Sequence, residues 1–170
     1  AYWNDKQTWS ECERIGGLLA SESLRLISQA PWQKAPALRN LSRQVRFPVQ
    51  SDEMWAVVTQ SPLKYPHNPD RSITVRMNLL HLGNAQILTI PGEALPNIGF
   101  YLKRNMQGEH NFLFGLTNDA FGYILTKVDF NSFPAYKYIS RTSLGEQTGE
   151  ILIQNALEMI KQASQTAKGF

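Results

Sequence analysis

Residues 73–93 read ITVRMNLLHLGNAQILTIPGE, in which two apolar runs flank a glycine–asparagine pair. Every second residue from Ile73 to Leu79 is apolar, which is typical of a strand with one buried face. A Gly83-Asn84 pair between two such runs indicates the turn of a β-hairpin. Because Pro91-Gly92 ends the second run abruptly, we expect antiparallel strands over residues 73–79 and 85–90.

The pattern extends to both sides of this hairpin. Ser10 and Glu13 form the pattern of a capping box at the start of an amphipathic helix. Residues 41–49 alternate like a half-buried strand that ends near Pro48. The expected helices span residues 10–29, 94–107 and 148–167, the further strands span residues 111–117 and 121–126, and the loops span residues 61–71 and 129–145. Residues 51–59 fit a short helix or a strand.

Helices that alternate with strands, together with one antiparallel hairpin, predict an α/β (α+β) fold. We expect a mixed sheet with helices packed on it. The length of 170 residues fits one domain, since domains usually have ~100–200 residues.

Composition narrows the class of protein further. The net charge is only +3, and the nearest approach to a basic run, Arg39, Arg43 and Arg46, is spaced out, so no nucleic-acid partner is expected. Cys12 is the only cysteine, which excludes an intrachain disulfide and a cysteine-based zinc site. No apolar run approaches the ~20 residues of a membrane helix. The N-terminal residues lack the pattern of a signal peptide.

The ionisable side chains suggest few sites by themselves. His67, His81 and His110 are not at the spacing of metal ligands, and each fits a surface or turn position. Glu93 follows a strand that ends in Pro-Gly, where a carboxylate binds a metal, acts as a base or caps the next helix. Spacing alone favours the cap. Tyr123, which follows the polar turn Asn118-Asp119, fits a core tyrosine.

Taken together, these segments resemble the neutral (non-lysosomal) ceramidase family of zinc-dependent amidases. The resemblance rests on Ile-Pro-Gly-Glu at 90–93, Gly-Leu-Thr-Asn at 115–118 and Gly-Tyr-Ile at 122–124. It continues through Tyr-Lys-Tyr at 136–138 and Thr-Ser-Leu-Gly at 142–145, and the helix around residues 12–20 is similar to one that precedes these motifs in the family.

The resemblance implies a function for three residues. In the family, two histidines, a glutamate and a tyrosine bind Zn²⁺, and the last two match Glu93 and Tyr123. A further tyrosine, matched by Tyr138, lies near the substrate amide. Zinc accepts carboxylate oxygen and keeps a position for water at catalytic sites, so this ligand set suits amide hydrolysis.

The sequence also departs from the family pattern. Nothing here matches the two histidine ligands and the catalytic serine, which lie upstream of the Pro-Gly-Glu motif in the family. Ile139 stands where many relatives carry an acidic residue. We therefore interpret residues 1–170 as a single domain or as the C-terminal half of a zinc hydrolase domain. The partner would be the N-terminal half, or a separate chain with the histidines, and the substrate an amide or lipid amide.

Several interpretations remain open at this stage. The chain is part of a zinc hydrolase, which the resemblance would place outside the cell or at a membrane, or it is a non-catalytic interaction domain derived from that family. A polyanion-binding module is suggested only by the small positive charge. If an upstream half is missing, Trp3, Trp9, Trp32 and Trp55 predict an exposed apolar patch near the N-terminus.

Overall fold

A computed structural model of the chain describes residues 7–167, and it divides the chain into two compact units, residues 1–35 and residues 36–170. Each unit is described by itself. None of the helices in the described part of the chain combines the length and apolar character needed to cross a membrane.

The first unit contains one helix, α1 (Trp9–Gln29). The side chain of Thr8 caps it by accepting a hydrogen bond from the Glu11 amide at 3.3 Å. The predicted capping box at Ser10 is therefore wrong, because Ser10 already lies in the first turn, whereas the predicted end at residue 29 is confirmed. Trp9 and Trp32 are exposed, Trp55 in the second unit is partly buried, and Trp3 lies outside the described residues.

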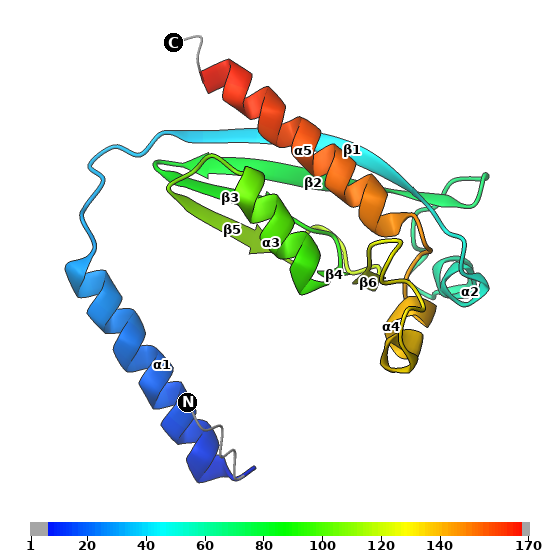
Figure 1. The fold of residues 1–170 in the computed structure, drawn as a ribbon, viewed down its shortest axis with the longest axis horizontal. Helices are drawn as coiled ribbons and strands as arrows, with labels where there is room; N and C mark the ends of the chain where they lie inside the picture. The colour runs from blue at the N-terminus through cyan, green and yellow to red at the C-terminus, as the bar shows by residue number, and fades with distance from the viewer. Residues whose placement is uncertain (1–6, 168–170) are drawn as a thin grey trace. The chain divides into compact units, whose positions relative to one another are not determined.

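The second unit is built on a four-stranded sheet in the order β1-β2-β3-β5 (Figure 1). Its strands are β1 (Leu38–Pro48), β2 (Ser72–Leu82), β3 (Ala85–Thr89) and β5 (His110–Phe114). β1 and β3 pair antiparallel with β2, whereas β5 pairs parallel with β3. The predicted hairpin is confirmed, since Leu82 faces Ala85 across the Gly83-Asn84 turn.

The core lies between one face of this sheet and two helices, α3 (Pro96–Asn105) and α5 (Thr148–Ala167) (Figure 1). Alternate strand residues point toward these helices, as the period of two predicts. The residues buried at this contact include Val45, Phe47, Ile73, Val75, Met77, Leu79 and Leu88 of the sheet and Ile98, Leu102, Leu152, Ala156 and Met159 of the helices. The predicted α/β class, with a mixed sheet and helices packed on it, is confirmed.

Other elements differ from the predictions or complete them. Residues 51–59, which fitted either state, form helix α2 (Asp52–Gln60), capped by Ser51 through a 3.2 Å bond from the Met54 amide. The predicted strand over 121–126 is only β6 (Tyr123–Ile124). The loop predicted over 129–145 contains the 3₁₀ turn η1 (Pro134–Tyr136) and helix α4 (Lys137–Arg141).

Candidate functional site

A short parallel ladder follows the main sheet and holds two of the predicted site residues. β4 (Glu93–Ala94) pairs with β6, and Glu93 lies directly opposite Tyr123. The Glu93 amide donates to the Gly122 carbonyl at 2.9 Å, and the Leu95 amide donates to the Ile124 carbonyl at 3.0 Å. Because the two strands run parallel and in register, the two side chains leave the ladder side by side.

A third segment brings in Tyr138. The Tyr123 amide donates to the Thr142 carbonyl at 3.1 Å, and an isolated parallel bridge joins Tyr123 to Ser143. Helix α4 ends at Arg141, and the amide and the hydroxyl of its C-cap residue Thr142 both donate to the Tyr138 carbonyl, at 3.0 Å and 2.9 Å. Thr142, whose carbonyl accepts the Tyr123 amide, therefore also fixes the end of the helix that carries Tyr138.

The three predicted site residues come together at this point. The rings of Tyr123 and Tyr138 meet edge to face, with centroids 5.9 Å apart and an interplanar angle of 71°. The negative charge of Glu93, together with partial burial and a hydrogen bond to that carboxylate, raises the pKa of Tyr123. Glu93 and Tyr138 are exposed, and Tyr123 is partly buried. The arrangement places two oxygen donors and a second phenol at one accessible position.

The alternative role of Glu93 as a helix cap is wrong. Helix α3 begins after Leu95, no side chain caps it, and its first turn contains no acidic residue. Glu93 instead lies in the ladder that precedes this helix. Its carboxylate is thus available to a ligand and to Tyr123.

Sequence reasoning missed the contribution of Ser143. Its hydroxyl is fully buried beside Tyr123 and has no hydrogen-bond partner among the described residues. A buried hydroxyl without a partner is costly, so it draws attention to its surroundings. The Thr-Ser-Leu-Gly motif was visible, but only the fold reveals that it pairs with Tyr123.

The histidines do not complete the site. His67 lies in the loop before β2, with its ring edge against Trp55, His81 lies near the end of β2, and His110 begins β5. Among the residues that the structure describes, no group of three or more histidine, cysteine, aspartate or glutamate side chains could hold a metal ion. Glu93 and Tyr123 thus lie together without a histidine from the described residues.

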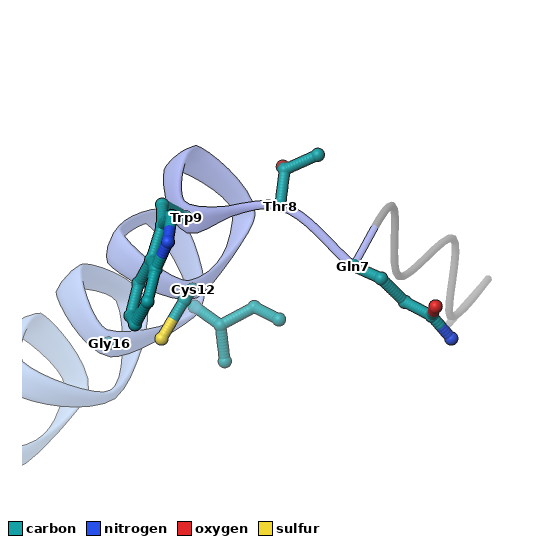
Figure 2. A pocket seen from close by; sticks show the side chains of 6 residues that line it. Gln7, Thr8, Trp9, Cys12 and Gly16 are labelled. Atoms are coloured by element: carbon teal, nitrogen blue, oxygen red, sulfur yellow. The ribbon is translucent and has the colours of Figure 1, made fainter.

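An apolar groove of about 400 Å³ begins at Glu93. The segment after β3, the start of α3 and the end of β5 form its walls, with Ile90, Leu95, Leu113 and Leu116 among the lining residues. A larger open hollow of about 860 Å³ lies in the first unit, where Trp9 and Cys12 share one side of α1 (Figure 2). Among the described residues, no carboxylate or histidine lines that hollow, whereas Glu93 lines the groove, so the groove is the better candidate site.

Comparison with known proteins places this geometry in a known fold. The chain is similar to the crystal structure of neutral ceramidase from Pseudomonas aeruginosa, with a TM-score of 0.66 and 15% identity, over 98% of this chain and 34% of that one. It is also similar to a structure described as a ceramidase complexed with C2, with a TM-score of 0.49 and 21% identity, over 64% of this chain and 17% of that one. No family model and no curated protein matches the sequence. The first likeness confirms the predicted resemblance at the level of the fold, over about a third of the ceramidase chain.

Proposed function

We propose that this chain is part of a zinc-dependent amide hydrolase similar to neutral ceramidase. In this proposal Glu93 and Tyr123 bind Zn²⁺, and Tyr138 contacts the substrate amide. The observation that carries it is the convergence of these three side chains, from three separate segments, within a fold shared with neutral ceramidase.

The donor set fits part of a zinc shell. A carboxylate oxygen is an ordinary zinc ligand, and a phenol becomes one when it loses its proton. Catalytic zinc usually has three protein ligands, so a polypeptide outside the described residues has to supply the histidines. The 34% coverage of the ceramidase supports this, because most of that protein has no counterpart here. When bound, zinc acidifies water and polarises the scissile carbonyl.

The residues of this chain have separate roles in the proposal. Glu93 supplies the negative charge that attracts a cation and orients the Tyr123 hydroxyl through a hydrogen bond. Tyr123 keeps its proton until a cation offsets the Glu93 charge, since that charge disfavours a phenolate. Tyr138 packs against Tyr123, and its exposed hydroxyl can donate a hydrogen bond to a substrate carbonyl.

The substrate and the location follow from the same proposal. The apolar groove at Glu93 suits an amide with an aliphatic substituent, which supports a lipid amide. Such a substrate is consistent with a secreted or membrane-associated enzyme. The partner is the polypeptide that carries the histidine ligands, as an N-terminal half or as a separate chain.

Native mass spectrometry with metal analysis tests the proposal. The chain would be expressed in the organism that encodes it and purified without denaturation. We expect about one zinc per assembly, a second polypeptide segment or chain, and hydrolysis of N-acyl amides. Glu93→Gln and Tyr123→Phe should each lower the zinc content, whereas Glu109→Gln and Tyr101→Phe, which change exposed residues elsewhere, should not.

Two outcomes would contradict the proposal in different ways. A fully zinc-loaded and active chain of 170 residues alone would exclude the need for other ligands. A metal-free assembly with no effect of Glu93→Gln would favour the alternative, a non-catalytic interaction domain. The absence of a complete metal cluster among the described residues is the observation that keeps this alternative open.

A further inference from the structure

The face of the main sheet opposite α3 and α5 carries a polar pocket that the proposed hydrolase site does not use. On β2, Thr74 and Arg76 point away from the core, since they alternate with the buried Ile73, Val75 and Met77. Arg76 lies opposite Gln44 of β1. Together with Asn118, these outward residues line an open pocket of about 330 Å³.

Arg76 differs from most arginines of the chain because it lacks a partner. Six others form ion pairs with carboxylates: Arg14, Arg25, Arg43, Arg46, Arg71 and Arg141. The guanidinium of Arg76 has neither an ion pair nor a hydrogen bond among the described residues. Arg104 also has no ion pair within residues 7–167, but it lies in the last turn of α3, where the helix dipole favours a cation.

The wall of the pocket is held by a turn with a left-handed residue. Asn118 has a φ of 68°, and its side-chain Nδ2 donates to the Arg76 carbonyl at 3.2 Å and to the Thr89 hydroxyl at 3.1 Å. Thr89 also accepts from the Asn78 amide at 2.8 Å, so the turn is tied to both β2 and β3. The side of the pocket formed by Asn118 is thus fixed by hydrogen bonds to two strands of the sheet.

The chemistry of the lining favours an oxyanion. None of the four lining residues is acidic, and Arg76, Gln44 and Thr74 all carry N–H or O–H donors. A guanidinium matches the two oxygens of a carboxylate in a fork geometry. Arg46, two residues from Gln44 on the same face of β1, is already paired with Asp70. One uncompensated positive charge suits a monoanion better than phosphate, which carries about −1.5 to −2 at neutral pH.

We infer that this pocket binds a carboxylate, held by Arg76 with help from Gln44 and Thr74. The carboxylate belongs either to a small organic acid or to an acidic residue of a polypeptide that covers the sheet face. Phe114 and Phe112 of β5, both about half exposed, lie on the same face, and Phe114 is opposite Thr89 in the register. The inference does not depend on zinc binding or on the hydrolase proposal.

NMR titration of the full chain tests this inference with sodium acetate as the first probe. Ionic strength is held constant with sodium chloride, because salt screens exposed charges. We expect saturable shifts of the Arg76 Nε–H and of the Gln44 side-chain amide. Arg76→Gln should weaken acetate binding about tenfold or more, and Arg76→Lys should weaken it less, since the charge remains but the fork is lost. Arg104→Gln should leave the affinity unchanged.

Two further probes separate the sources of the carboxylate and the class of anion. Acetyl-Leu-Glu-Leu-amide should bind more tightly than acetate and shift Phe114 resonances if a polypeptide is the natural source. Equal affinity indicates a small acid, and acetyl-Leu-Gln-Leu-amide should not bind in either case. Inorganic phosphate should bind no better than acetate. The inference would be overturned if neither acetate nor acetyl-Leu-Glu-Leu-amide gave a saturable response. A response that persists in Arg76→Gln, or phosphate that binds more tightly than acetate, would also overturn it.

Discussion

Glu93 controls the protonation of Tyr123, its neighbour across the β4–β6 ladder. The carboxylate raises the pKa of the phenol because a second negative charge beside it is unfavourable, and partial burial adds to this effect. Tyr123 is therefore neutral at physiological pH when no cation is bound. The pair can hold a proton between them, and a metal ion would have to displace that proton.

Glu93→Gln should lower the pKa of Tyr123 toward the ordinary value of about 10. The amide removes the charge but keeps the size of the side chain, so the effect of partial burial remains. NMR of ring-labelled tyrosine measures this pKa directly. Glu109→Gln, at the opposite end of β5 from Phe114, should leave it unchanged. An unchanged or higher pKa in Glu93→Gln would contradict the contact.

Gly122 is the residue on which the ladder depends. Its φ is +102°, and a Cβ at this position would lie 2.1 Å from the Thr142 carbonyl oxygen. Its own carbonyl accepts the Glu93 amide. A side chain here would thus separate the segments that carry Glu93, Tyr123 and Tyr138.

Gly122→Ala should destabilise the fold by about 2 kcal/mol or more, through strain at positive φ and loss of the ladder. Gly99→Ala is the matched control: in helix α3 its Cβ would make an ordinary contact of 3.4 Å with Leu113, and alanine gains about 0.5–1 kcal/mol over glycine. Urea unfolding measures both. A change under about 0.5 kcal/mol in Gly122→Ala would show that Thr142 moves freely.

The elements that sequence predicted well are those whose signals are local. The β2–β3 hairpin needs only alternation and a Gly-Asn turn, and both lie within residues 73–90. Residues 51–59 were left open between a helix and a strand, although α2 has a local signal as well: Ser51 is a cap, and Asp52 and Glu53 form an acidic first turn. The start of α1 was misplaced because Thr8 and Ser10 are both good caps, and the sequence pattern does not choose between them.

The elements that were missed depend on distant partners. Helix α4 has only five residues, and two hydrogen bonds from distant segments hold it in place. The Asn131 amide donates to the Ser140 hydroxyl, and the Tyr123 amide donates to the Thr142 carbonyl. β4 has two residues, and its partner β6 lies thirty positions later in the chain. No periodicity can develop over such short segments, so pattern alone could not find them.

The contact between α3, α5 and the sheet contains most of the largest fully buried side chains among the described residues. Leu102, on α3, has no exposed surface. Leu102→Ala should lower the free energy of unfolding by about 2–5 kcal/mol, because it removes buried methyl groups and leaves a cavity. Val128→Ala, where the valine is 81% exposed, should change it by less than about 0.5 kcal/mol. If Leu102→Ala and Val128→Ala changed the free energy of unfolding in urea equally, packing of α3 would not stabilise the core.

At the scale of the whole molecule, the candidate site is a meeting point of segments that are far apart in sequence. The family resemblance predicted Glu93, Tyr123 and Tyr138 as site residues, whereas spacing alone favoured a helix cap for Glu93 and a core position for Tyr123. The parallel register of β4 and β6, and the bridge to Ser143, explain why these residues meet. Such pairings between distant segments are not encoded in any short stretch, so only the fold could show that Glu93, Tyr123 and Tyr138 are neighbours.

A site with two oxygen donors makes a specific prediction for the zinc affinity of the full chain. Binding by the chain alone should be weak, since catalytic zinc needs about three protein ligands. The affinity should rise with pH, because the raised pKa keeps Tyr123 protonated at neutral pH and a phenolate ligand must release that proton. Because binding releases one proton, the zinc affinity should rise by at most about tenfold per pH unit.

Competition with a chromophoric chelator between about pH 6 and about pH 8 measures this dependence below the raised pKa of Tyr123. Tyr123→Phe should both weaken binding and abolish the slope, because it removes the only proton that binding displaces. Tyr101→Phe, which changes an exposed tyrosine on α3, should leave both the zinc affinity and its pH dependence unchanged. A slope that survives in Tyr123→Phe would assign the proton to another group. Tight, pH-independent binding by the chain alone would show that the ligand set is complete without Tyr123 and without a partner.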